Sequence, residues 1–355
     1  MLSGIKVVEL AGILAGPAVG MFFAELGATV YKIENPDTGG DATRAWKLPH
    51  ENPTAAISAY YAAVNYGKHT IWANVERDTA AKARIEALLE EADIVITNFK
   101  HASALRLGFD AETLRSRYPR IIVAEISGYP DGDETPAFDV VLQAETGFMH
   151  LNGENGGLPL RMPVALVDVL AAHQLKEGIL LALLRRATTG EGATVRVTLY
   201  EAALASLVNQ ASGYLMTGVT PERNGSLHPT IAPYGEVVYS ADGVPLVLAV
   251  GTDRHFTHLC ALLGIPALAH HPDYATNPAR VRHRQTLLAA LQAAFGTHQF
   301  ADITPQLKMA GVPCGAIQPL DAVFAAPAAK RMVLRETTAD GTETARVRTA
   351  VFTIH

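Results

Sequence analysis

The sequence predicts an α/β protein with a large domain built on a parallel sheet and a smaller α/β domain that follows it. Along the first half of the chain, short apolar runs rich in β-branched residues alternate with amphipathic helical stretches. That alternation is typical of βαβ units, in which helices join parallel strands. The composition changes at residues 216–235, which are rich in Pro, Gly, Asn and Thr and indicate a linker between the two parts.

The elements of the large domain follow in order. Residues 5–10 (IKVVEL) are a short apolar run that predicts a buried strand, and the glycines and Pro17 after it predict a turn and a helix that ends at Gly27. The later elements are predicted strands at 28–34, 93–99, 119–129 and 193–199 and predicted helices at 78–92, 169–187 and 200–215. Residues 1–205 therefore predict a Rossmann-like layer, with 206–235 as linker and loop.

The smaller α/β domain is expected at residues 236–325. Strands are expected within 236–251, helices around 254–263 and 280–296, and a terminal strand at GVPCGAIQ, residues 311–318. Residues 326–355 predict a β-ribbon, and we expect this segment to return to the large domain.

Composition narrows the choice of partners. Of the 355 residues 18% are charged, below the roughly 25% usual for soluble domains, so we expect an oligomer that buries much of its surface. A net charge of −6 without a basic run argues against nucleic acid. No apolar run could span a bilayer, the first residues lack the features of a signal peptide, and the two cysteines fit a reducing compartment. We therefore expect no membrane partner and a cytoplasmic location.

Motifs for metal and hydrolytic chemistry are missing from the sequence. Thirteen histidines are present, but no HxxxH, CxxC or DxDxDG spacing occurs, so we expect no metal. The nucleophile elbow GxSxG of serine hydrolases is absent as well. Residues 9–20 (ELAGILAGPAVG) have a strand–glycine–helix order that could hold an anion at a helix N-terminus, and a tight packing turn is an equally good interpretation.

Asp168 is the most unusual charged residue of the chain. It follows PVALV and precedes VLAA, and a carboxylate among apolar residues costs free energy unless something stabilises its charge. One interpretation is an N-cap for a helix beginning at Val169, because Asp is favoured at that position. The other is a nucleophile, since a partly desolvated anion at a helix N-terminus could act as a covalent catalyst. The pattern leaves both interpretations open.

Several segments together resemble the class III CoA-transferase family, of the formyl-CoA transferase and carnitine CoA-transferase type. They include LSGIKVVELAGILAGP, LGATVYKIENPDTGGDATR, ADIVITNFK, FDVVLQAETGFM, PVALVDVLAAHQLKEG and NGSLHPTIAPY, in the family's order over nearly the whole chain. The family also contains α-methylacyl-CoA racemases. These carry a histidine where this chain has Phe138 and a glycine run after the aspartate where this chain has VLAAH, so both positions favour a transferase.

The resemblance implies roles for particular residues. Asp168 matches the nucleophile, and Asp139 matches an acidic or polar position close to it. The family's basic residue after KIE is replaced by Asn35, which puts one phosphate contact of coenzyme A in question. The implied coenzyme A contacts are Ile13, Leu14 and Ala15 beside the thioester and Asn98, Phe99 and Arg106 around the adenosine and phosphates, while Gly225 and His228 belong to the flap that shields the intermediate.

The function implied by the resemblance is transfer of coenzyme A from an acyl-CoA to a free carboxylic acid, through an aspartyl-acyl anhydride and an aspartyl-CoA thioester. Coenzyme A would be a substrate, with no tightly bound cofactor, and the protein an interlocked homodimer. Arg161 is a candidate for the second carboxylate of a dicarboxylic acid, although a surface role fits it equally well. Two alternatives stay open: a racemase-type epimerase of the same fold, and a nucleotide-binding module in which Asp168 is only a cap.

Overall fold

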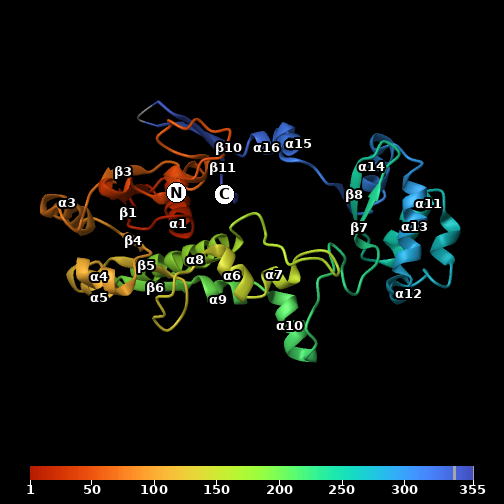
Figure 1. Ribbon diagram of the computed structural model, residues 1–355, viewed down its shortest axis with the longest axis horizontal. Helices are drawn as coiled ribbons and strands as arrows, with labels where there is room; N and C mark the ends of the chain where they lie inside the picture. The colour runs from red at the N-terminus through yellow and green to blue at the C-terminus, as the bar shows by residue number, and fades with distance from the viewer. Residues whose placement is uncertain (339–340, 355) are drawn as a thin grey trace. The chain divides into compact units, whose positions relative to one another are not determined.

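The computed structural model describes residues 1–338 and 341–354 and divides into two compact units (Figure 1). The first unit contains residues 1–149, 161–221 and 330–355, and the second contains residues 150–160 and 222–329. In this division the C-terminal segment groups with the first unit, and residues 150–160 group with the second, a grouping that the sequence pattern had not indicated. Among the described residues, no helix is both long and apolar enough to cross a membrane.

The first unit is built on a six-stranded sheet whose strands all run parallel, which confirms the predicted α/β fold. In spatial order the strands are β3 (His69–Trp72), β2 (Thr29–Glu34), β1 (Lys6–Glu9), β4 (Ile94–Thr97), β5 (Ile122–Ser127) and β6 (Ala193–Thr198). The order reverses between β1 and β4. In doubly wound sheets, ligands bind at the carboxyl ends of the strands beside such a reversal.

Helices cover both faces of this sheet, and each face has its own core. Successive strand residues point to opposite faces, so Val7 of β1 packs into the cluster beneath α1 (Ala15–Glu25) and α8 (Leu166–Thr189), and Val8 packs into the cluster beneath α3 (Thr79–Glu90) and α5 (Ala111–Arg117). Burial on both faces explains why these strands appear in the sequence as continuous apolar runs.

The remaining elements of the first unit are short. They are the helices α2 (Ala59–Ala62), α4 (His101–Leu107), α6 (Asp139–Glu145), α9 (Leu199–Ala205) and α10 (Val208–Thr217), and the antiparallel ribbon of β10 (Val333–Thr337) and β11 (Glu343–Val347). The chain passes between the units at residues 149–150, 160–161, 221–222 and 329–330, the first of these within α7 (Phe148–Leu151) and the last within α16 (Pro327–Lys330). Glu25 at the end of α1 anchors the C-terminal segment, because its carboxylate pairs with Arg346 at 2.6 Å and accepts the N–H of Ala350.

The structure differs from the predicted elements of the first unit at three places in particular. The predicted helix at 200–215 is two helices, α9 and α10. Strand β3 was not predicted, because HTIW lies at the sheet edge, half exposed, and lacks an apolar run. Helix α8 begins at Leu166 rather than Val169, because a side chain distant in sequence caps its first turn.

The second unit contains a three-stranded antiparallel sheet with helices packed against it. Its strands are β7 (Tyr234–Tyr239), β8 (Pro245–Ala249) and β9 (Cys314–Ala316). Its helices are α11 (Asp253–Leu262), α12 (Asn277–Arg282), α13 (Arg284–Phe295), α14 (Phe300–Met309) and α15 (Leu320–Ala325). The buried cluster around Val238, Leu248, Phe256 and Phe295 forms a core separate from those of the first unit.

Candidate active site

A cavity of about 530 Å³ opens at the carboxyl ends of the parallel strands of the first unit. The turns after β1 (residues 12–15), after β4 (97–101) and after β5 (127–137) line it, together with the residues at the start of α6, α8 and α9. Its volume is within the range of small-molecule sites, and it lies beside the reversal of strand order between β1 and β4.

The cavity brings together most residues that the sequence singled out. Those that line it are Ile13, Leu14, Ala15, Asn98, Phe99, Phe138, Asp139 and Asp168. Arg106 is not among the lining residues, and its guanidinium pairs with Glu76 at 2.7 Å on the surface. Gly225 and His228 belong to the second unit.

Asp168 lies in the first turn of α8, where it is 7% exposed. The helix begins at Leu166, so the interpretation of Asp168 as the N-cap is wrong. Within the described part of the chain its carboxylate has neither a hydrogen-bond partner nor an ion pair, unlike the carboxylates that cap other helices here, such as Asp78 and Asp110. A carboxylate that is buried, unpaired and open to a cavity is available to react with a ligand.

Asp139 caps α8 from the neighbouring helix α6. Its Oδ1 accepts the N–H of Val167 at 2.7 Å, and its Oδ2 accepts Nε2–H of Gln143, also at 2.7 Å. Gln143 continues the chain of contacts, since its Oε1 accepts the N–H of Met162 at 2.8 Å. These bonds fix the start of α8, and with it the position of Asp168, against α6.

The surroundings make Asp168 a stronger base than an ordinary carboxylate. Burial, and next the negative charge of Asp139, raise its pKa to about 7. Tyr60 lies close enough that, after burial, the charge of Asp168 raises the pKa of its hydroxyl, which therefore stays protonated at neutral pH. A carboxylate with a pKa near neutrality is more nucleophilic than one at its ordinary value and still ionises under physiological conditions.

The turn after β1 forms one wall of the cavity. The Asn98 side chain holds the first residue of this turn on both sides, because its Oδ1 accepts the N–H of Gly12 at 3.3 Å and its Nδ2 donates to the carbonyl of Gly12 at 3.1 Å. Ile13 follows with a φ of 73°, a left-handed conformation that is rare for a β-branched residue. Such strain near a cavity is a frequent feature of functional sites.

The loop at residues 223–235 of the second unit is anchored along its length. The N–H of Gly225 donates to the carbonyl of Gly153 at 3.0 Å, and Arg284 donates to the carbonyls of His228 and Ile231 at 2.7 and 2.6 Å. Gly225 has a φ of 57°, which favours glycine.

Two residues that interact with Asp139 or Asp168 were not predicted from the sequence. Gln143 is four residues after Asp139, a spacing that places both on one face of a helix and could have suggested their contact. Tyr60 gave no signal, because it lies in a short helix between loops. The described residues contain no group of three or more His, Cys, Asp or Glu side chains that could hold a metal ion.

Comparison with known proteins shows the family. The model of CoA-transferase family III matches residues 2–355. A succinate–glutarate CoA-transferase of Agrobacterium fabrum is 38% identical over 99% of this chain and 88% of its own length, and an acetyl-CoA:oxalate CoA-transferase of Acetobacter aceti is 33% identical over 94% and 85%. The crystal structure of a CAIB/BAIF family protein from Brucella suis is 36% identical and superposes with a TM-score of 0.84 over 99% of this chain and 92% of that one. The chain therefore belongs to CoA-transferase family III and is a CoA-transferase that uses CoA thioesters as substrates.

Proposed function

We propose that this enzyme moves coenzyme A from an acyl-CoA to a free carboxylic acid with Asp168 as the nucleophile. The observation that carries the proposal is the state of this carboxylate, which is buried at the cavity, has no partner within the described residues and has a pKa raised to about 7. In such a site the charged carboxylate is poorly solvated. It therefore attacks a carbonyl carbon more readily than a fully hydrated carboxylate would in water.

The proposed reaction begins on the donor. A carboxylate oxygen of Asp168 attacks the thioester carbonyl, the C–S bond breaks, and coenzyme A thiolate leaves behind a mixed anhydride. The thiolate then attacks the aspartyl carbonyl and releases the donor acid as its carboxylate. The enzyme now carries coenzyme A as an aspartyl thioester.

The second half repeats these steps on the acceptor. Its carboxylate attacks the aspartyl thioester, the thiolate leaves, and a new anhydride forms. Attack of the thiolate on the acceptor's acyl carbon gives the product thioester and restores the Asp168 carboxylate. No water is consumed and no net proton moves, so water that reaches either intermediate is a competing reactant.

We further propose a dicarboxylic acid as acceptor. Similar proteins are named for such acids, among them a succinyl-CoA:mesaconate CoA-transferase of Haloarcula marismortui at 31% identity. Arg161 is an exposed residue without an ion-pair partner in the part of the chain described. Burial and the charge of Asp168 raise the pKa of the Tyr60 hydroxyl, whereas the positive charge of Arg161 lowers it, so both charges act on the same hydroxyl. The N–H of its neighbour Met162 donates a hydrogen bond to Gln143, which in turn contacts Asp139 at the start of α8. A guanidinium in that position could bind the carboxylate that does not react.

The 223–235 loop is proposed as the cover that keeps water from the intermediates. A bulky residue at Gly225 would be strained at its φ of 57° and would meet the Glu154 carboxylate at 2.8 Å from its Cβ. If the loop has this role, Gly225→Leu raises hydrolysis of acyl-CoA relative to transfer. An unchanged ratio of hydrolysis to transfer would remove the loop from the mechanism.

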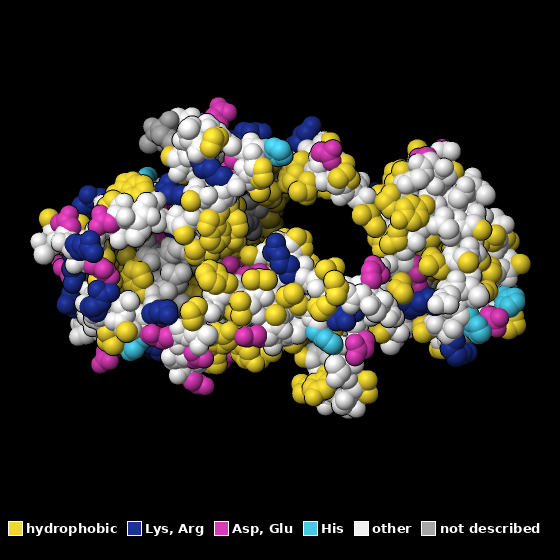
Figure 2. Space-filling view, in the orientation of Figure 1, with side chains coloured by type: hydrophobic (Ala, Val, Ile, Leu, Met, Phe, Trp, Pro, Cys, Tyr) yellow, Lys and Arg dark blue, Asp and Glu magenta, His cyan; other side chains and the backbone are white. Residues whose placement is uncertain are grey.

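A homodimer with interlocked chains is also proposed. Large apolar side chains are exposed on α8 and α10, and hydrophobic atoms gather over α10 in the space-filling view (Figure 2). These side chains are Leu180, Leu181, Leu184, Tyr214, Leu215 and Met216. Exposed apolar surface of this extent is typical of a protein interface.

The test of the nucleophile is trapping with hydroxylamine. Wild-type enzyme is incubated with acyl-CoA and treated with hydroxylamine, and we expect a hydroxamate on the peptide that contains Asp168. Asp168→Asn should give no hydroxamate and lose transfer by several orders of magnitude, because the amide has no anionic oxygen. Glu177→Gln is the matched control, an exposed acid on the same helix. A label on Asp139, or an active Asp168→Asn enzyme, would show that another carboxylate reacts.

A further inference from the structure

We propose that Asp41 is a positioning residue for the reaction: its carboxylate, anchored by buried Lys32, holds Ile13 in the left-handed conformation and thereby places the 12–15 turn against the nucleophile. The part of this inference that concerns the reaction rests on the proposed function. The part that concerns the turn stands on the contacts alone.

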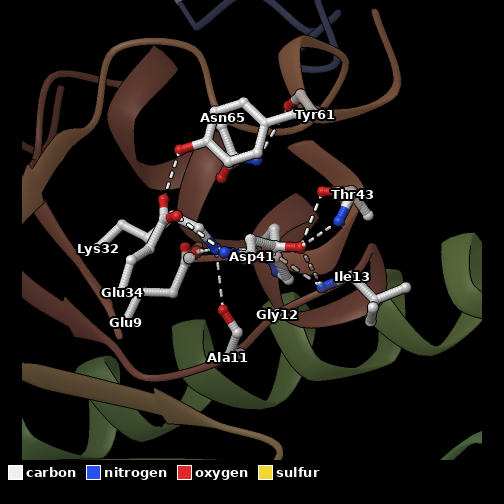
Figure 3. A network of polar contacts seen from close by, with 12 residues as sticks. Glu9, Ala11, Gly12, Ile13, Lys32, Glu34, Asp41, Thr43, Tyr61 and Asn65 are labelled. Carbon is white, nitrogen blue, oxygen red and sulfur yellow. Dashed lines mark hydrogen bonds and ion pairs between the residues drawn. The ribbon is translucent and has the colours of Figure 1, made fainter. Parts of the chain in front are cut away.

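The contact between Asp41 and the turn is direct. Both carboxylate oxygens of Asp41 accept the N–H of Ile13, at 3.3 Å from Oδ1 and 3.1 Å from Oδ2 (Figure 3). Ile13 has a φ of 73°, in the left-handed region of the backbone. This region costs free energy for any L-residue and is especially rare for β-branched residues such as isoleucine. Asn98 holds Gly12, and its Nδ2 donates to the Gly12 carbonyl, which belongs to the same peptide group as the Ile13 N–H. Asp41 therefore binds the N–H end of this peptide and Asn98 its carbonyl end, and the bond to Asp41 is the one that the strained residue itself donates.

Asp41 is in turn fixed by buried groups. It is 8% exposed, and its Oδ1 accepts the N–H and the Oγ1–H of Thr43 at 3.0 and 2.8 Å. Its Oδ2 lies 3.0 Å from Nζ of Lys32, which is 1% exposed on β2. Although burial opposes ionisation, the charge of Lys32 and the bonds from Thr43 keep the pKa of Asp41 below its ordinary value, so the carboxylate stays charged.

Lys32 connects Asp41 to the strand from which the turn starts. Its Nζ donates to Oε1 of Glu9 at 3.0 Å and to the carbonyl of Ala11 at 2.9 Å, and both acceptors belong to the segment that leads into the turn (Figure 3). Lys68 pairs with Glu9 at 2.8 Å and donates to the carbonyl of Pro17 in α1 at 2.8 Å. The buried charges thus hold the residues on both sides of the turn.

A role limited to stability is a weak explanation of this network. Buried ion pairs contribute little net stability, and apolar residues of similar volume often replace them without loss. What the network specifically maintains is one strained residue, and Ile13, Leu14 and Ala15 line the same cavity as Asp168. Strain maintained by its surroundings is typical of sites that must be held in one geometry.

The informative variant is Asp41→Asn. Both carboxylate oxygens accept the N–H of Ile13, so in either orientation the NH₂ group of the amide lies against that N–H and opposes the tether. In one orientation the NH₂ group also faces the donors of Thr43, and in the other the ammonium of Lys32. Without the tether, Ile13 favours other conformations by about five- to thirty-fold. We expect the rate of anhydride formation at subsaturating acyl-CoA to fall by a factor in that range, and the KM of the acceptor acid to stay unchanged.

A second substitution separates positioning from general stability. Glycine adopts a φ of 73° readily, so Ile13→Gly needs no tether. Asp41→Asn should therefore lower the rate of anhydride formation much less in the Ile13→Gly background than in wild type. Ile13→Gly alone is the reference, because it shows the effect of losing the isoleucine side chain. Asp37→Asn, an exposed acid of the same loop, is the control and should leave transfer unchanged.

Hydrogen exchange of the peptide spanning residues 10–20 and the affinity for coenzyme A are measured on all variants, with thermal unfolding as a control. Faster exchange in Asp41→Asn, weaker binding of coenzyme A, and recovery in the double variant support the proposal. Equal losses in both backgrounds, or unchanged exchange, overturn it. If wild type transfers no coenzyme A, the proposed function fails, while exchange and binding still decide whether Asp41 holds the turn.

Discussion

Replacing Asp168, the proposed nucleophile, should make the protein more stable at neutral and alkaline pH. Asp168 is buried with no partner among the described side chains, and its pKa is raised from 3.8 to about 7. A raised carboxyl pKa means that the folded state binds more protons than the unfolded state between about pH 4 and 7, so wild type loses stability as the pH rises through that window. Asp168→Asn removes the titrating group, so the variant should not lose stability in this pH window for that reason.

The size of the effect follows from the shift. A difference of about three pKa units corresponds to about 4 kcal/mol of destabilisation above pH 7, at 1.36 kcal/mol per unit. The amide of Asn is itself buried without a partner, which costs about 1–3 kcal/mol. We therefore expect a net gain of about 2 kcal/mol at pH 8, or a rise in Tm of roughly 4–8 °C for a domain of this size. Near pH 4 the gain disappears, because Asp168 is protonated in both states.

Thermal unfolding of wild type and Asp168→Asn from pH 4 to pH 8 measures this difference, with transfer activity assayed on the same samples. Glu177→Gln should show no pH-dependent change in Tm relative to wild type, because it lies exposed on the same helix. Parallel pH profiles for wild type and Asp168→Asn, or a variant that is less stable at pH 8, would refute the reasoning. Either result would mean that the Asp168 carboxylate has a stabilising partner in the folded protein.

Three further predictions concern the same region. Asp139→Asn removes the charge that helps raise the pKa of Asp168, so the midpoint of the pH profile for anhydride formation should move below pH 7; a midpoint that stays in place would contradict this. Arg161→Gln should raise the KM of a dicarboxylic acceptor about tenfold or more and leave a monocarboxylic acceptor unaffected, as measured by steady-state kinetics; equal changes for both acids would exclude Arg161 as the specificity residue. The protein should be a dimer by light scattering at micromolar concentration, with a buried area well above the roughly 1,600 Å² of a standard interface, and a monomer would remove the proposed interlocking.

The fold could be predicted from the sequence where burial leaves a continuous apolar run. Strands β1, β4 and β5 are buried on both faces and stand out as such runs. Strand β3 at the sheet edge leaves no such pattern. Asp168 was conspicuous for a related reason, since one acid interrupts a long apolar segment.

The contacts that position the site could not be predicted, because they join residues distant in sequence. The start of α8 depends on Asp139, twenty-eight residues before the Val167 amide that it caps, so local pattern placed the helix start three residues too late. Lys32 occupies the middle of a strand, and only the folded chain brings Asp41 and Glu9 to it. A charged residue at a strand position that alternation assigns to the interior is the one local sign of such a network.

A comparison of the buried acids in this unit supports the proposed role of Asp168 as the nucleophile. Glu9 is paired with two lysines, Glu34 with Arg44 and Tyr61, and Asp41 with Lys32 and Thr43. Each of these carboxylates has a partner that offsets the cost of its burial. The two other buried acids in the described part of this unit, Asp110 and Asp139, accept backbone N–H groups at the starts of helices. Asp168 has none within the described residues, and burial together with the negative charge of Asp139 makes its ionisation harder. A fold that gives its other buried acids partners but leaves one open to a cavity and destabilised as an anion keeps that anion reactive toward an electrophile.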